Sequence, residues 1–409
     1  MSIDLQSLTP PPFNPAVLKS ARAKFRHSLD DLVDFSKIAK SSLEKIESGT
    51  KVPTTKQISL FAKLYSLQEY EFFNESVPDY PEVPVDFRDG GSIGPNLLKI
   101  INEANTKSSQ LLKIVSILEK PRSKLSNLSA SSIKELTSEA YISDVRKALK
   151  FNAEDILKLN TSKKRALSNF LFRYRVEAVG ASISHISFSL RDASGVLTST
   201  NAVPTIIVNT TKHKNSYDFT IAHKLAHLLL KKPGISNSGF DDGNQVERAC
   251  NSFAKSLLAP KYIVKESFAA SASVASNVNQ IHKNTLLSKI ASAYRLLEEG
   301  LISRTELRSW VENHKPKLVK GGYNPENYHG IDGHIFAKLN KAGILRTALV
   351  KGCLDNQYVT HFEAAGLLGY RTDYLDDVVF LIKQRRQDIS DLLGHNYFSS
   401  TTSAYIEDL

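Results

Sequence analysis

The chain has 409 residues, a length that is enough for two to four domains that each bury a core of their own. Its apolar fraction of 41% and charged fraction of 23% are typical of an ordinary globular protein, and no apolar run reaches the roughly 18 to 20 residues that cross a bilayer. The formal net charge of +11 favours polyanionic partners, although a generally basic solvated surface explains it equally well.

The chain contains two cysteines, Cys250 and Cys353, which are far apart in sequence. Two such cysteines do not build a disulfide framework, so we expect both thiols to stay reduced. The N-terminus has no basic segment followed by an apolar one, as a secretory signal would. We therefore expect a soluble, cytoplasmic protein without a membrane partner.

Residues 13–75 are predicted to form a compact helical unit, because their apolar positions recur at steps of three and four residues. Ser28 is followed three residues later by Asp31, a spacing that favours the start of a helix. Gly49 is expected to end a helix, and Pro53 to open the next one.

A linker is predicted over residues 76–92, where prolines at short intervals keep the chain extended. Residues 93–176 follow with a helical pattern, and we interpret them as a helical connector. A serine- and lysine-rich stretch over 121–132 is expected to break that pattern.

The periodicity changes from about residue 177, where polar and apolar residues alternate over 182–190. Alternation of this kind predicts a half-buried strand. The pattern over 177–302 predicts a small α+β domain, and residues 303–409 return to a helical pattern. The expected elements of the small domain are a strand at 182–190, a turn at 192–195, a strand at 203–209, a long helix, a loop at 234–244 and a helix at 245–258.

Two histidines, His223 and His227, lie four residues apart in that long helix. At this spacing both imidazoles are on one helical face and can reach a single zinc ion, as in the H-E-x-x-H signature of zinc peptidases. The signature has a glutamate after the first histidine, which accepts a proton from the zinc-bound water. Here that position is Lys224, whose ammonium group cannot accept a proton at neutral pH.

Zinc in a catalytic site normally takes three protein ligands, so a third is expected from the helix at 245–258. Glu247 and Cys250 both lie on one side of that helix, near its apolar stripe, and either can point at the ion. A packed core histidine pair and an exposed helical glutamate are the corresponding readings without a metal.

These segments resemble the ImmA/IrrE family of zinc metallopeptidases. The likeness covers 219–229 and 247–260, together with a strand that ends at Asn209 and a helix and turn over 287–302. It implies a zincin-like fold over 177–302 and zinc bound by His223, His227 and Glu247.

This chain departs from the family pattern at four positions. Ala226, Cys250 and Ala259 are mild changes, and the family's alanine at the position of Cys250 favours packing over a nucleophilic thiol. Lys224 is the severe change, because it replaces the catalytic glutamate. We expect weakened or retained zinc binding and almost no peptidase activity. The ammonium raises the electrostatic cost of holding zinc unless the long lysine stem carries it towards solvent. A naturally decayed enzyme and a selected or introduced knockout both explain this residue.

Residues 28–53 resemble the lambda-repressor/Cro type of helix-turn-helix. The resemblance implies that the second helix of the motif enters the major groove of double-stranded DNA. A helical protein-interaction module that kept the fold without binding DNA is the alternative. The residues that the resemblance brings to DNA are Lys40, Ser41, Ser42, Lys45 and Lys51.

The fold class expected from all of this is mainly α, with a small α+β zincin-like domain and an N-terminal helix-turn-helix bundle. The two resemblances together imply a DNA-binding regulator whose zinc-peptidase-like domain is directed at a specific protein partner, such as a repressor or a toxin-system component in a phage or stress response. A non-catalytic transcriptional regulator or antitoxin is the alternative, and a scaffold with structural zinc is a third. A homodimer is compatible with each.

The region 303–409 is interpreted as structural or partner-binding. His329 and His334 lie five residues apart there and can be read as a second metal pair, although a solvated loop is the preferred interpretation.

Overall fold

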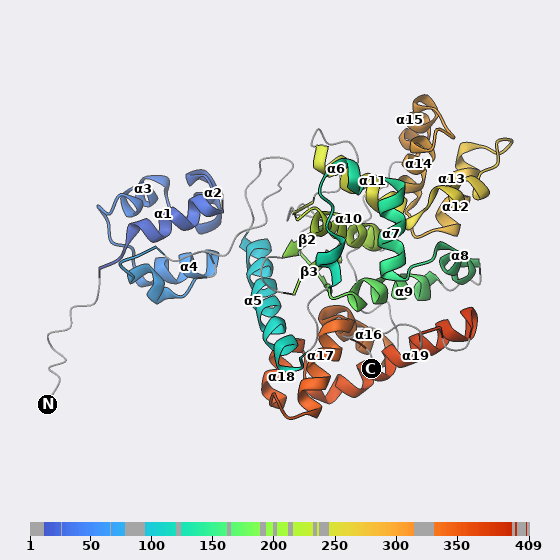
Figure 1. Ribbon diagram of the computed structural model, residues 1–409. Coiled ribbons are helices and arrows are strands. Elements are labelled where there is room, and N and C mark those ends of the chain that lie inside the picture. Colours follow the sequence, from blue (N-terminus) through green and yellow to red (C-terminus); the bar gives the residue numbers. More distant parts are fainter. Residues whose placement is uncertain are drawn as a thin grey trace. The chain divides into compact units, whose positions relative to one another are not determined.

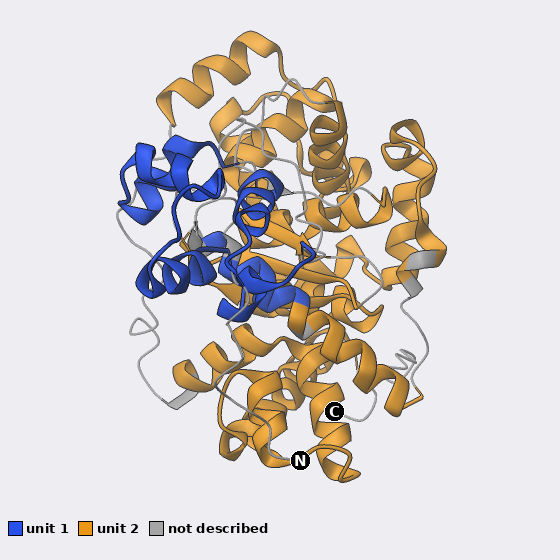
Figure 2. Cartoon of the chain, turned by 90° about the vertical axis from the view of Figure 1, so that its left-hand side faces the viewer, with its two compact units in different colours: residues 1–83, 89–105 blue, residues 84–88, 106–409 orange. Residues whose placement is uncertain are grey.

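The structure is a computed structural model, shown in Figure 1. It describes residues 12–25, 27–65, 67–77, 95–119, 124–161, 165–188, 194–198, 203–211, 216–231, 235–236, 245–314, 331–394, 397–398 and 406. The chain divides into two compact units, residues 1–83 with 89–105 and residues 84–88 with 106–409 (Figure 2). The linker predicted at 76–92 lies almost wholly outside the described residues.

The first unit is a helical bundle, as the periodicity predicted. Ser28 caps its second helix, since the Ser28 hydroxyl accepts from the backbone N–H of Asp31 at 3.0 Å and the Asp31 carboxylate accepts from the backbone N–H of Ser28 at 2.7 Å. Its elements are α1 (Pro15–Lys24), α2 (Leu29–Ser36), α3 (Lys40–Glu47), α4 (Thr55–Tyr65) and the 3₁₀ helix η2 (Glu69–Phe73).

A half-buried ion pair fixes α3 against α1 within this unit. Arg22 donates from Nε to one carboxylate oxygen of Glu47 at 2.6 Å and from Nη2 to the other at 2.9 Å. The third nitrogen of Arg22 donates to the carbonyl of His27 at 2.8 Å, at the turn that leads into α2. Such a two-pronged arrangement fixes the orientation of both partners.

The second unit is mainly helical with one small sheet, so the predicted class of a mainly α chain with a small α+β domain is confirmed. None of the helices in the described ranges combines the length and the apolar composition needed to cross a membrane. Helix α5 (Pro95–Ile117) begins in the first unit and ends in the second. The 3₁₀ helices of the second unit are η3 (Lys124–Leu128) and η6 (Thr372–Tyr374). Its further α-helices are α6 (Ile133–Leu136), α7 (Glu139–Leu149), α8 (Ala153–Thr161), α9 (Arg165–Ala178), α10 (Tyr217–Leu229), α11 (Gln245–Leu258), α12 (Lys261–Ser267), α13 (Val274–Asn284), α14 (Lys289–Glu298), α15 (Arg304–Asn313), α16 (Ile331–Ala342), α17 (Ile344–Asp355), α18 (His361–Leu368) and α19 (Leu375–Leu393).

The sheet has the strand order β1-β3-β2-β4, with β1 (Ser182–Ile186) parallel to β3 (Thr205–Asn209). The predicted strands at 182–190 and 203–209 correspond to β1 and β3. Two short strands were missed: β2 (Gly195–Thr198) begins in the expected turn, and β4 (Ile235–Ser236) lies in the expected loop. All four residues of β2 are buried, so the strand shows no alternation of polar and apolar residues.

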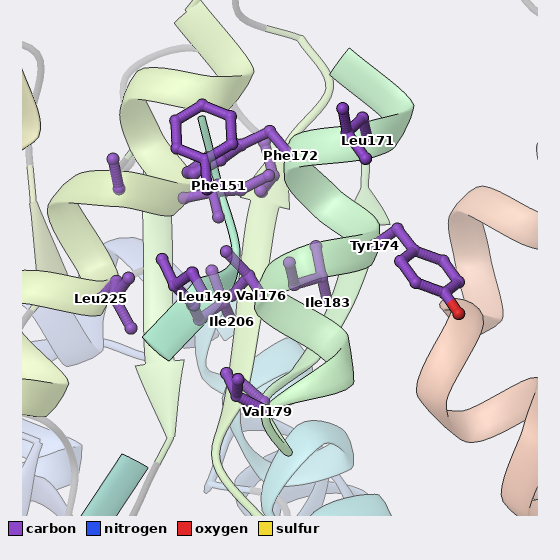
Figure 3. Close-up of a cluster of buried hydrophobic side chains, with 14 of the residues drawn as sticks. Leu149, Phe151, Leu171, Phe172, Tyr174, Val176, Val179, Ile183, Ile206 and Leu225 are labelled. Carbon is purple, nitrogen blue, oxygen red and sulfur yellow. The ribbon is translucent and has the colours of Figure 1, made fainter. Parts of the chain in front are cut away.

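Helix α10 is held against the sheet by a continuous apolar core. Phe172 and Val176 of α9, Ile183 of β1, Ile206 of β3 and Leu225 of α10 are all fully buried, and Figure 3 shows them gathered around the strands. Burying each such side chain contributes about 1.5–3 kcal/mol. This packing fixes the helix that carries both candidate metal-binding histidines.

The free edge of β1 is closed by two side chains of α9. Glu177, which is fully buried, accepts from the backbone N–H of Ile183 at 3.0 Å, while Arg173 donates to the carbonyl of the same residue at 3.0 Å. The Glu177 carboxylate also accepts from the backbone N–H groups of Ile344 at 3.0 Å and Leu345 at 3.3 Å, at the start of α17. The pair therefore closes an edge that is otherwise open to strand addition and joins the C-terminal helices to the sheet.

Gly343 allows this close approach of α17. Its φ of 88° is strained for any residue with a side chain, and a Cβ there lies 2.4 Å from the Ile183 carbonyl oxygen and 2.6 Å from a Glu177 carboxylate oxygen. The space for this contact exists because position 343 has no side chain.

Gly343→Ala is therefore expected to lower the free energy of unfolding of the second unit by about 2–4 kcal/mol, from a strained backbone and a displaced carboxylate. Urea denaturation measures the change. The control is Gly366→Ala inside α18, where nothing lies within 4 Å of the added Cβ and a gain of up to about 1 kcal/mol is expected. Equal effects of the two substitutions contradict the assigned role of Gly343.

Candidate metal centre

The centre is built from α10 and α11, which pack directly against each other. His223 and His227 lie one turn apart on α10 and are 3% and 1% exposed. Helix α11 is fixed at its C-terminal end, where Arg146 donates to the Leu257 carbonyl at 3.0 Å and Arg295 donates to the Ala259 carbonyl at 3.0 Å. Those carbonyls have no partner within the helix, so the two guanidinium groups hold α11 in place.

Glu247, in the first turn of α11, points at both imidazoles. Its carboxylate oxygens lie 3.1 Å from His223 Nε2 and 2.9 Å from His227 Nε2, and the two Nε2 atoms are 3.0 Å apart. Glu247 is 0% exposed, so it is not a solvated helical charge. The structure thus brings together the three side chains that the sequence resemblance assigned to zinc.

Burial sets the protonation of this cluster. Burial, reinforced by the charges of His227 and Lys224, lowers the pKa of His223 to about 3 in spite of its hydrogen bond with Glu247. Burial alone raises the pKa of Glu247, but the hydrogen bonds from His223 and His227 hold it well below its usual value. At neutral pH the cluster therefore offers a neutral imidazole and an ionised carboxylate, which are the forms that bind metals.

The geometry fits a zinc ion. The ligand atoms of the three residues all lie within 4.8 Å of one another. Bonds of about 2.1 Å in a tetrahedral arrangement place ligand atoms about 3.4 Å apart, so the cluster has to widen by a few tenths of an ångström. Two nitrogens and one oxygen are also a donor set that zinc takes in catalytic sites, where a fourth position stays open.

Within the described ranges, no second group of three histidine, cysteine or acidic side chains comes close enough to hold a metal. Cys250 is buried but is not part of the cluster, so Glu247 rather than Cys250 completes it. The prediction of a loop at His334 is wrong, because His334 lies in α16. Its side chain is exposed, and its Nε2 is 2.8 Å from the Lys338 ammonium. His329 falls outside the described residues.

Lys224 is fully buried, with 0% exposure, next to the first histidine. Of the two possibilities, the one in which the stem carries the ammonium to solvent is therefore ruled out. Its charge acts on the cluster, since it contributes to the lowered pKa of His223. A basic group thus occupies the interior at the position where the H-E-x-x-H signature has its proton acceptor.

Two buried polar residues on the helices that carry the cluster were missed by the sequence reasoning. Asp218, in the first turn of α10, has its pKa raised to about 7 by burial, although the charge of Arg165 opposes the shift. Asn251 lies four residues after Glu247 in α11 and is 5% exposed. The signal for Asn251 is in the sequence, as a polar residue on the apolar stripe of an amphipathic helix.

The predicted DNA-binding residues lie on α3 and just after it. Lys40, Ser41, Lys45 and Lys51 are exposed, and Ser42 is half-buried. The Lys40 ammonium is 2.9 Å from an Asp30 carboxylate oxygen, and the Lys51 ammonium donates to the Ser42 hydroxyl at 2.7 Å. Both contacts are exposed, and an exposed ion pair such as that of Lys40 with Asp30 contributes little to stability.

Comparison with known protein families finds a match for one segment of the second unit, residues 176–301. No curated protein and no solved structure matches the chain. Residues 176–301 match the peptidase family M78, described as the IrrE N-terminal-like domain, and the matched segment contains His223, Lys224, His227 and Glu247. Members of this family are typically zinc-dependent, so the chain contains an ImmA/IrrE-like metallopeptidase domain in which a lysine follows the first histidine.

Proposed function

We propose that this protein is a DNA-binding regulator whose zinc-peptidase-like domain is directed at a specific protein partner. The glutamate-bearing form of the domain cuts that partner, and Lys224 leaves the present form inactive. The observation that carries the proposal is the pairing of a buried His–His–Glu cluster with a fully buried Lys224. The cluster supports metal binding, and the lysine argues against catalysis. A repressor or a toxin-system component is the class of partner that the family resemblance supports.

His223, His227 and Glu247 are the residues that would hold zinc. The ion, when bound, acts as a Lewis acid and lowers the pKa of a water molecule. Peptide cleavage also needs a group that takes the water's proton, and such general-base catalysis contributes about 10²–10⁴-fold to the rate. The Lys224 ammonium can only donate protons, so the chain lacks that step.

The alternative is a regulator or antitoxin whose domain never had a cleavage target and uses the partner-binding surface alone. The burial of Lys224 favours it, since a buried cation is costly and is kept only if its surroundings accommodate it. The two candidates differ in what the glutamate-bearing form does. Both cysteines are buried and neither forms a disulfide, which fits action in a reducing cytoplasm.

Lys224→Met is expected to raise zinc affinity by tenfold or more, because it removes a buried positive charge near a dication while keeping similar side-chain volume. Competition with a chromophoric chelator measures the dissociation constant. His227→Ala is the control and should abolish tight binding. An unchanged affinity in Lys224→Met means that the ammonium does not act on the site.

Lys224→Glu is expected to increase cleavage of the true partner by at least 10²-fold, because it supplies the missing base. Purified variants are incubated with the proteins encoded beside this one, and cleavage is scored by mass spectrometry. Lys224→Gln is the matched control, which removes the charge without supplying a base. A zinc-loaded Lys224→Glu protein that cuts none of them favours the regulator that never cleaves.

Lys40→Ala and Lys45→Ala are each expected to weaken binding of double-stranded DNA, by about tenfold if they contact bases and with a shallower salt dependence if they contact phosphates. Fluorescence anisotropy at several stated salt concentrations measures this on a duplex selected from a random pool. Lys63→Ala on α4, also exposed, is the control. Failure of the wild-type chain to enrich any duplex supports the protein-interaction module.

A further inference from the structure

Arg346, in the first turn of α17, is a charged side chain in the interior of the second unit. It is 2% exposed and is one of the largest fully buried side chains of the described residues. An arginine is almost never buried to this extent unless an acceptor pairs with it. Burial lowers the pKa of Arg346 to about 10, so the guanidinium group stays positively charged at neutral pH.

No acceptor in the described ranges takes a hydrogen bond from this guanidinium group. Its Nε is sealed from solvent and has no hydrogen-bond partner. The two terminal nitrogens form no hydrogen bond or ion pair either, but they are not among the sealed atoms, so part of the slight exposure of Arg346 lies at the end of its guanidinium group. The group therefore has all five N–H donors to offer, and its end is open to a small molecule from outside.

The carboxylate whose charge acts on Arg346 is that of Glu177, and it is already committed to other donors. One of its oxygens accepts from Arg173 Nε at 3.0 Å and from the backbone N–H of Ile344 at 3.0 Å. The other oxygen accepts from two further backbone N–H groups, at 3.0 and 3.3 Å. Arg173 is 5% exposed and Glu177 is 0% exposed. Two buried guanidinium groups thus share one buried carboxylate, which leaves one positive charge uncompensated.

A second donor lies beside Arg346. The Tyr370 hydroxyl is sealed from solvent and has no hydrogen-bond partner. Burial raises the pKa of Tyr370 to about 12, although contact with Thr347 and the charge of Arg346 oppose the shift, so the hydroxyl keeps its proton. The Thr347 hydroxyl donates its own proton to the Gly343 carbonyl at 2.6 Å. Two neighbouring buried donors without an acceptor need an explanation, and a ligand that accepts from both supplies one.

We propose that Arg346 and Tyr370 form a binding site for a small monovalent carboxylate. The planar guanidinium fork matches the two oxygens of a carboxylate, and the tyrosine hydroxyl can add a third hydrogen bond. A single negative charge balances the positive charge that Glu177 leaves uncompensated, whereas a dianion overshoots it. The burial of Arg346 restricts the ligand to about the size of formate or acetate. This site needs neither zinc nor the N-terminal unit.

Formate is the probe, and chloride at the same ionic strength is the reference anion. Saturation-transfer NMR from the protein to the formate proton measures binding directly, and acetate should displace formate. The midpoint of thermal unfolding of the wild-type chain is expected to be about 2–4 °C higher in formate than in chloride, the shift that a ligand at several times its dissociation constant gives a domain of this size.

Arg346→Met removes the charge while keeping a long side chain. It is expected to weaken formate binding by tenfold or more and to abolish the formate-specific shift, yet to unfold no earlier than the wild-type chain in chloride, because an uncompensated buried charge has been removed. Tyr370→Phe, which removes only the hydroxyl, should weaken binding about three- to tenfold. Arg308→Met is the control, since the Arg308 side chain is 84% exposed on α15, and it should change neither signal.

Several outcomes overturn the proposed site. Wild-type protein without saturation transfer to formate, or with equal transfer in Arg346→Met, has no carboxylate bound at Arg346. A formate shift that persists in Arg346→Met is a general salt effect. Chloride that displaces formate as well as acetate does shows an unselective anion site. If Arg346→Met does not fold, Tyr370→Phe decides, and unchanged formate binding in that variant contradicts the assigned donors.

Discussion

The contact between Glu247 and two imidazoles across the α10–α11 interface is the interaction on which the functional reading of this chain depends. A fully buried carboxylate that lies 3.1 and 2.9 Å from two buried histidine nitrogens needs compensation, either from protons or from a metal ion. The rest of the second unit holds this contact in place. The sheet and its apolar core fix α10, and the guanidinium groups of Arg146 and Arg295 fix the end of α11.

The C-terminal helices are part of the same arrangement, although the match to the M78 family ends at residue 301. Glu177 and Arg173 satisfy the outer edge of β1 and bond to the start of α17 and the end of α16. A single buried ion pair thus closes the sheet edge and anchors two helices that lie more than 150 residues further along the chain. The sheet that supports α10, the helix with His223 and His227, therefore depends on contacts with residues beyond the matched segment 176–301.

Local patterns in the sequence predicted those features that are set by local chemistry. The helical cap at Ser28 follows from a side chain three residues from its partner, and the shared face of His223 and His227 follows from helical periodicity. The short strands β2 and β4 could not be predicted. All four residues of β2 are buried and β4 has only two residues, so neither strand shows an alternation of polar and apolar side chains. The burial of Lys224 and the unsatisfied amide of Asn251 depend on how α10 and α11 pack, which no local window of sequence encodes.

Anomalous diffraction at the zinc absorption edge, from crystals of the wild-type chain grown with zinc, tests the central claim most directly. The account predicts one strong peak about 2.0–2.2 Å from His223 Nε2, His227 Nε2 and one carboxylate oxygen of Glu247. A map without a peak between these three atoms, or with Glu247 turned away from both rings, contradicts the claim that this buried cluster is a metal centre.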